Sequence, residues 1–167
     1  MKRGFFLFHG LPGVGKTALC KQLAATMPNM FFANLAASPD FKKMPMRSIC
    51  VSMYGTAPSG SSLITEGVLP TISSRDKLVN SVLSGIRASY DISFDVVGIV
   101  FIRESDWMFM SKRRNRSAEE YRRANETMQP GSADFEYIVY EPDDTERGNL
   151  DERTRRISSL LTARLAG

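Results

Sequence analysis

Cysteine, histidine and tryptophan are scarce in this chain of 167 residues, which has two cysteines, one histidine and one tryptophan. Cys20 and Cys50 lie far apart, without the close spacing of metal ligands, so we expect buried thiols, a reducing compartment and a cytoplasmic location. No run approaches the roughly 18 apolar residues that a membrane span needs, so no membrane partner is expected. The apolar run 4–9 is too short for a secretory signal, and we expect no targeting segment.

The composition is that of a globular protein, with 43% hydrophobic and 24% charged residues. The length predicts a single domain over residues 1–167, and neither a repeat nor a linker interrupts it. The net charge of +4 favours a partner that carries phosphate. Charge alone leaves nucleic acid and small phosphate ligands as equal alternatives, and it does not indicate an oligomeric state.

A glycine-rich segment directly follows the apolar run 4–9 and matches the P-loop pattern, in which backbone N–H groups at the start of a helix bind phosphate. Within it a lysine can reach the outer phosphates, and the hydroxyl that follows can ligate Mg²⁺. We therefore predict a nucleoside triphosphate, ATP, with Mg²⁺ as the bound cofactors. The predicted binding residues are Gly10, Leu11, Pro12, Gly13, Val14, Gly15, Lys16 and Thr17.

Hydrophobic patterns alternate between strand and helix along the whole chain. Together with the P-loop motif, this alternation predicts an α/β protein with the three-layer P-loop NTPase fold and a five-stranded parallel sheet. The density of basic residues predicts an arginine-rich helical lid at about 106–130. Residues 41–60 are left open as either a substrate-side insertion or a core segment. We expect strands at 4–9, 29–36, 62–67, 94–102 and 135–140, and helices at 17–27, 74–89, 106–128 and 150–165, the last with Asn149 as its N-cap.

Ligands of such sheets bind at the carboxyl ends of the strands, which makes the residues just after each strand candidates. Glu66 ends the third strand and can hold the water shell of the Mg²⁺, although an ordinary loop carboxylate is the alternative. Asp40 follows the second strand and can act as the general base for an attacking hydroxyl, with a turn residue as its alternative. Arg75 can bind an acceptor phosphate or simply begin a helix.

The predicted lid is dense in arginine, which binds phosphate oxygens in two-point fashion. We expect at least one of Arg113, Arg114 and Arg116 to face phosphate as a catalytic residue. The alternative is a solvated helix held by pairs spaced four residues apart, such as Glu119 with Arg123. Both can hold, with Arg122 and Arg123 pairing outward.

Taken together, these motifs make the chain resemble the small P-loop kinases of nucleotides and nucleic-acid ends. Its first forty residues are most similar to the phage-type polynucleotide 5′-kinases, which have an acidic, an aromatic and a basic residue where this chain has Asp40, Phe41, Lys42 and Lys43. The resemblance implies a kinase that phosphorylates the 5′-hydroxyl of a polynucleotide, with Asp40 as general base and Lys42 or Lys43 binding the acceptor phosphate. A nucleoside or nucleoside-monophosphate kinase is the alternative. A nucleotide-binding ATPase or switch module is the alternative of another class.

Overall fold

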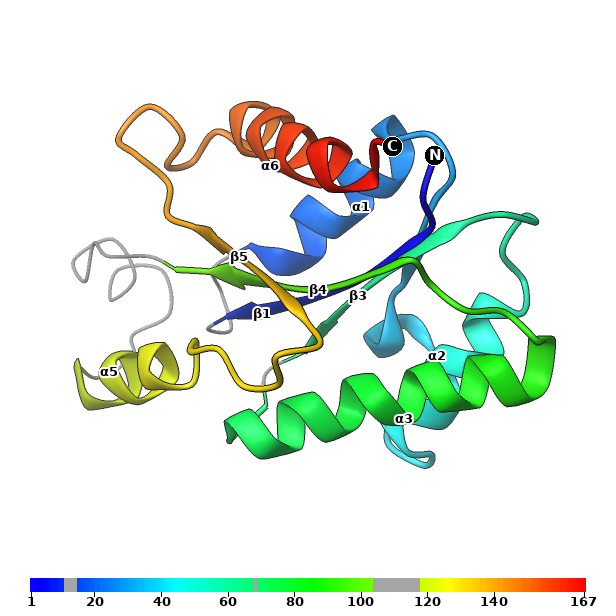
Figure 1. Cartoon of the computed structure of the whole chain (residues 1–167). Helices are drawn as coiled ribbons and strands as arrows, with labels where there is room; N and C mark the ends of the chain where they lie inside the picture. Colours follow the sequence, from blue (N-terminus) through cyan, green and yellow to red (C-terminus); the bar gives the residue numbers. More distant parts are fainter. Residues whose placement is uncertain (11–14, 68, 104–117) are drawn as a thin grey trace.

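The computed structural model describes residues 1–10, 15–67, 69–103 and 118–167. It contains one five-stranded sheet in the order β2-β3-β1-β4-β5, and every neighbouring pair is parallel (Figure 1). The strand that leads into the P-loop is therefore central. The strands are β1 (Gly4–Gly10), β2 (Met30–Ala33), β3 (Ser62–Gly67), β4 (Val96–Ile102) and β5 (Glu136–Tyr140).

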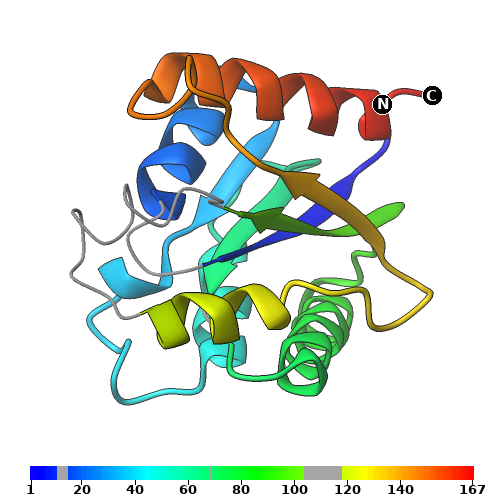
Figure 2. The ribbon, with the colours of Figure 1, turned by 90° about the vertical axis from the view of Figure 1, so that its left-hand side faces the viewer.

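Helices cover both faces of the sheet, which confirms the predicted three-layer α/β fold. In Figure 1, α1 (Lys16–Thr26) and α6 (Leu150–Leu165) lie above the sheet, whereas α2 (Met46–Tyr54) and α3 (Ile72–Tyr90) lie below it. The short helix α5 (Ala118–Glu126) lies near the end of the sheet that faces the viewer in Figure 2. No helix of the described ranges is long and apolar enough to cross a bilayer.

Side chains on the two faces of β1 pack in two separate hydrophobic clusters. Phe6 and Phe8 pack in the cluster beneath α1 and α6, whereas Phe5 and Leu7 pack in the cluster beneath α2 and α3. All seven residues of β1 are buried, as a strand covered on both faces should be. Both cysteines are buried as predicted, and neither forms a disulfide.

Residues 41–60 contain a helix that the sequence patterns did not predict. Helix α2 buries Ile49, Cys50 and Tyr54, and the Tyr54 hydroxyl donates a hydrogen bond of 2.6 Å to the carbonyl of Ser61. Its N-cap is Pro45, which makes no side-chain cap, so the usual sequence sign of a helix start is missing. For residues 46–54, the core alternative is therefore the right one.

Several element boundaries also differ from the predicted ones, and two of these differences have a clear local cause. The second strand ends at Ala33 and not at residue 36, because a 3₁₀ turn (Leu35–Ala37) follows it. Helix α3 begins at residue 72 and not at 74, because Thr71 and Ser74 form a reciprocal capping box in which serine replaces the usual glutamate. The predicted cap of α6 is confirmed, since Asn149 Oδ1 accepts a hydrogen bond of 3.2 Å from the N–H of Glu152.

Helix α3 carries a fully buried guanidinium, that of Arg75. Its Nη1 donates hydrogen bonds to the carbonyls of Thr127 (3.1 Å) and Gln129 (2.7 Å), and its Nη2 lies 3.0 Å from Asp76 Oδ1. The guanidinium also lies 5.2 Å from the ring centroid of Phe101 in β4. Arg75 thus ties α3 to the segment that joins α5 to β5.

We expect Arg75→Ala to lower the free energy of unfolding by about 3 to 5 kcal/mol, because it strips two carbonyls of their donor and Asp76 of its cation. Urea unfolding followed by circular dichroism measures this change. Lys77→Ala is the matched control, because Lys77 is exposed on the same helix. A loss no larger than that of the control would contradict the structural role of Arg75.

His9, the only histidine of the chain, is buried next to this cluster. Its Nε2 lies 3.0 Å from the hydroxyl oxygen of Thr127. Burial, followed by the positive charges of Arg75 and Lys16, lowers the pKa of His9 from 6.5 to about 4. Between pH 6.5 and 4 the unfolded chain binds a proton at His9 that the folded protein does not bind. The free energy of unfolding is therefore unaffected by this group above pH 6.5 and decreases as the pH falls from 6.5 towards 4.

A proton NMR titration can test this directly, since one histidine gives one set of ring resonances. We expect a midpoint near pH 4 in the folded protein, provided that it stays folded there, and near 6.5 in the urea-unfolded chain. A folded-state midpoint near 6.5 would show that the ring of His9 is solvated and not buried.

Candidate functional site

The candidate site lies where β1 and β3 end side by side. The parallel register pairs Phe8 with Glu66 across β1 and β3, and it pairs Gly10 with Ile102 across β1 and β4. The P-loop therefore starts at the centre of the carboxyl edge, next to the strand that ends with Glu66. Figure 2 shows the ribbon from this end.

The start of α1 concentrates positive charge. Gly15, its N-cap residue, has a φ of 93°, which glycine adopts without steric cost. Lys16 is the first residue of the helix, is only 7% exposed, and donates a hydrogen bond of 2.8 Å from Nζ to the carbonyl of Gly10. The first turn holds no acidic residue, so no helix carboxylate offsets the lysine and the positive end of the helix dipole. This arrangement suits a phosphate group.

Thr17 and Glu66 are brought together across this edge. The Thr17 hydroxyl donates a hydrogen bond to Glu66 Oε1, while Glu66 Oε2 is buried and accepts no hydrogen bond from the described part of the chain. Hydroxyl and carboxylate oxygens are hard donors, and Mg²⁺ in such sites takes few protein ligands besides water and phosphate. The pair fits Mg²⁺ for this reason. Among the described ranges, no group of three or more His, Cys, Asp and Glu side chains forms a site for another metal.

The structure thus gathers Lys16, Thr17 and Glu66 at one edge, as the sequence analysis expected. Their catalytic and binding roles remain predictions. Seven of the predicted site residues fall outside the described part of the chain. Four belong to the P-loop and three are the predicted lid arginines: Leu11, Pro12, Gly13, Val14, Arg113, Arg114 and Arg116.

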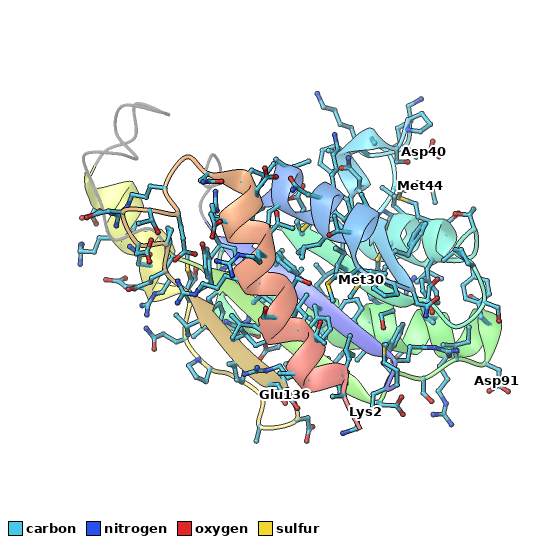
Figure 3. The ribbon with its side chains drawn as sticks, turned by 90° about the horizontal axis from the view of Figure 1, so that it is seen from above. Lys2, Met30, Asp40, Met44, Asp91 and Glu136 are labelled. Atoms are coloured by element: carbon cyan, nitrogen blue, oxygen red, sulfur yellow. The ribbon has the colours of Figure 1, made fainter. Side chains whose placement is uncertain are left out.

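Asp40, Lys42 and Lys43 lie together in an exposed turn between β2 and α2. The Asp40 carbonyl accepts a hydrogen bond of 2.8 Å from the N–H of Lys43, and the Asp40 N–H donates to Ser38 Oγ at 3.2 Å. Figure 3 shows Asp40 at the margin of the molecule beside α2, away from the end where α5 lies. Asp40 is therefore a turn residue in this conformation, and its proposed role as general base needs this turn to approach the P-loop.

The position of Arg75 differs from that expected of an acceptor ligand. The side chain is fully buried, Nη1 donates to the carbonyls of Thr127 and Gln129, and Nε donates to Asp76 Oδ1. It lies in the first turn of α3, close to the alternative interpretation that it begins a helix. The prediction that Arg75 binds an acceptor phosphate gains no support, because solvent does not reach the guanidinium.

The described part of the predicted lid supports the outward pairing of two arginines. Arg122 Nη2 lies 2.7 Å from Glu119 Oε2, and Arg123 Nε lies 3.0 Å from Glu119 Oε1. All three side chains are exposed, so each pair contributes little stability. These two arginines form ion pairs on the solvated face of α5, as the sequence predicted.

Sequence reasoning missed a second buried arginine, Arg153, at the start of α6. It lies on the same face of the helix as Ile157 and Leu161, at a spacing of four residues, and it is only 7% exposed. A charged residue in line with an apolar helix face was the available signal.

A buried pair, Tyr140 and Glu146, was missed as well. The Tyr140 hydroxyl donates to Glu146 Oε2, and burial raises the pKa of Tyr140.

Solved structures with this fold include several small kinases. A sugar kinase from a Janibacter species is 19% identical, with 97% of this chain and 95% of that chain covered and a TM-score of 0.58. A putative kinase from Chloroflexus aurantiacus is 15% identical, with 98% of each chain covered and a TM-score of 0.60. A thymidylate kinase from Candida albicans is 11% identical, with 98% and 92% covered and a TM-score of 0.55. These likenesses establish the P-loop NTPase kinase fold.

No curated protein sequence matches the chain. The sequence model of one family, however, matches residues 6–138, which begin within β1, end within β5 and include the P-loop and Glu66. The chain belongs to the ATPase family associated with various cellular activities (AAA).

Proposed function

We propose that the protein is an ATP-dependent phosphotransferase that moves the γ-phosphate of ATP to a hydroxyl group of a small acceptor. The observation that carries this proposal is the pairing of Thr17 with Glu66 beside the buried Lys16, because it joins a phosphate cradle to oxygen donors for Mg²⁺. When bound, Mg²⁺ neutralises charge on the phosphate oxygens. Lys16 binds and orients the outer phosphates, and Glu66 holds the Thr17 hydroxyl in place.

Transfer to an acceptor is favoured over simple hydrolysis by the structural neighbours. These neighbours include the sugar kinase and the thymidylate kinase, and each is covered over more than nine tenths of its length. These are enzymes of small molecules, which supports a small acceptor for this chain. Residues Arg113, Arg114 and Arg116 are proposed to close over the transferring phosphate as lid arginines.

The 5′-hydroxyl end of a polynucleotide is the second candidate acceptor. One observation favours it. Lys42 and Lys43 are exposed beside Phe41, a large hydrophobic residue that is 42% exposed, and such a combination suits a phosphate backbone and a stacked base. Hydrolysis without an acceptor, as in an ATPase or switch module, is the remaining alternative, with which membership of the AAA family is compatible.

The test is transfer of label from γ-labelled ATP and Mg²⁺ to a panel of sugars, nucleosides, nucleoside monophosphates and a 5′-hydroxyl oligonucleotide. We expect a labelled small molecule. Label only on the oligonucleotide would favour the second candidate. Release of labelled phosphate alone, across the whole panel, would contradict a phosphotransferase.

Lys16→Ala should reduce transfer by about 10²-fold or more, because it removes the cation that meets the outer phosphates. The label-transfer assay measures the change, and Lys21→Ala, at an exposed position of the same helix, is the matched control. Retained turnover in the Lys16 variant would contradict the assignment of the P-loop as the ATP site.

Asp40→Asn should leave ATP binding nearly intact and cut transfer by roughly 10²-fold, as loss of a general base does. Single-turnover rates and equilibrium ATP binding measure the two effects separately. Asp91→Asn, in an exposed residue far from the P-loop edge (Figure 3), serves as the control. An unchanged transfer rate would leave Asp40 as a turn residue only.

A further inference from the structure

A small cavity lies beside the carboxyl edge of the sheet, between the end of β4 and the end of α5. Its volume is about 330 Å³, which is within the range of pockets that bind small molecules. One lining residue follows β4 and the others belong to α5 or follow it: Arg103, Arg122, Asn125, Glu126 and Gln129. All five side chains are polar or charged, so the cavity suits a polar ligand.

Two contacts place this cavity next to the start of the P-loop. Arg103 directly follows the β4 residue that pairs with Gly10, where the P-loop begins. On the other side, Thr127 belongs to the same segment as three lining residues, and its hydroxyl oxygen lies 3.0 Å from His9 Nε2 of β1. Figure 2 shows α5 at this end of the sheet. The cavity is therefore adjacent to the loop that binds ATP in the proposed function.

The wall that the end of α5 forms is held by buried groups. Arg75, which is fully buried, donates hydrogen bonds from Nη1 to the carbonyls of Thr127 and Gln129. Met128, between these two residues, is buried as well. The backbone that carries the lining amides is thus fixed by tertiary contacts before any ligand binds, which lowers the entropic cost of binding.

The side chain of Arg103 falls on the α5 side of the sheet. Side chains alternate along β4, so that Phe101 packs in the cluster beneath α2 and α3, whereas Ile102 packs in the cluster beneath α1 and α6. The next residue, Arg103, is expected on the face of Phe101, and Figure 1 shows α5 below the sheet on that same side. Its place in the lining of the cavity agrees with this alternation.

The charges of the cavity differ in whether the protein neutralises them. Arg122 lies 3.2 Å from Glu126 and 2.7 Å from Glu119, so these charges offset one another. Within the described ranges, by contrast, neither an ion pair nor a hydrogen bond engages the half-buried Arg103 guanidinium. The side-chain amides of Asn125 and Gln129 make no hydrogen bond with the described residues either.

These three side chains define the chemistry of a ligand. A guanidinium binds a carboxylate or a phosphate group in two-point fashion. A carboxamide both donates and accepts hydrogen bonds, which suits hydroxyl groups. One cation beside two carboxamides therefore fits a small molecule that carries an anionic group and several hydroxyl groups.

We propose that this cavity is the acceptor subsite, in which Arg103 binds the anionic group of a small polyhydroxylated acceptor, a sugar acid or a sugar phosphate. Asn125 and Gln129 bind its hydroxyl groups. This inference rests on the proposed function, because it takes the P-loop as the ATP site. It narrows the class of acceptor and makes Arg103 the residue that distinguishes charged sugars from neutral ones.

The test compares glucose, gluconate and glucose 6-phosphate, which are similar in their hydroxyl groups and differ in charge. Calorimetry measures their binding to wild-type protein, Arg103→Gln and Arg103→Lys, and label transfer from γ-labelled ATP with Mg²⁺ gives KM and kcat. We expect the wild type to bind at least one anionic probe more tightly than glucose, and the tighter of the two identifies a carboxylate or a phosphate as the recognised group.

Arg103→Gln should weaken binding of the anionic probe by about 10-fold or more and raise its KM accordingly, because a charge-assisted contact is lost. Binding of ATP should change little. Arg103→Lys should recover only part of the loss, since lysine keeps the charge without the two-point geometry. Arg123→Gln is the matched control, because it removes an arginine of α5 that is 73% exposed and pairs with Glu119, and it should behave as the wild type.

Equal binding of glucose and both anions by the wild type would overturn the proposal, as would unchanged anion binding in Arg103→Gln. An equally large loss of ATP binding in Arg103→Gln would also overturn it, because Arg103 would then belong to the ATP site. Anion binding that depends on Arg103, without transfer of label to any acceptor, would support the anion site and contradict the proposed phosphotransferase.

Discussion

The parallel pairing of β1 with β3 is the constraint on which the whole site depends. Side chains alternate along β3, so that Ile64 packs beneath α1 and Leu63 packs beneath α2. Burial of these two residues fixes the face on which Glu66 emerges, which is the face of α1 and Thr17. A shift of one residue in the register would move Glu66 to the opposite face. The hydrophobic cores therefore position the polar site, and the strand order places it at the centre of the edge.

Two buried arginines show how differently a charge can be accommodated in one small fold. Arg75 is held by carbonyls, a carboxylate and aromatic rings, so its partners all belong to the protein. Arg153 instead lies against the backbone of the P-loop at Gly15. The first is an arrangement expected to serve stability, because every partner is fixed when the chain folds. The second packs against the residue that precedes α1, and so it links the last helix to the first.

The strands and the long helices could be predicted from the sequence because their periodicity is strong. The third strand and the last helix have the predicted bounds, residues 62–67 and 150–165, since alternation and capping signals agree there. The P-loop motif likewise located Lys16 and Thr17, and the strand ending in Glu66 placed that residue beside them. Helix α2 was missed because it is short and begins after a proline without a polar cap. The environments of Arg75 and Arg153 depend on contacts between distant segments, which local patterns do not encode.

The most direct test of the site is the Mg²⁺ dependence of ATP binding, measured by calorimetry on wild-type protein and on Glu66→Gln. If Thr17 and Glu66 together hold the ion, excess Mg²⁺ should tighten ATP binding to the wild type, and most of that gain should disappear in the variant while binding in EDTA stays the same. An equal gain in both proteins would contradict a metal role for Glu66. No ATP binding in either condition would contradict the nucleotide site as a whole.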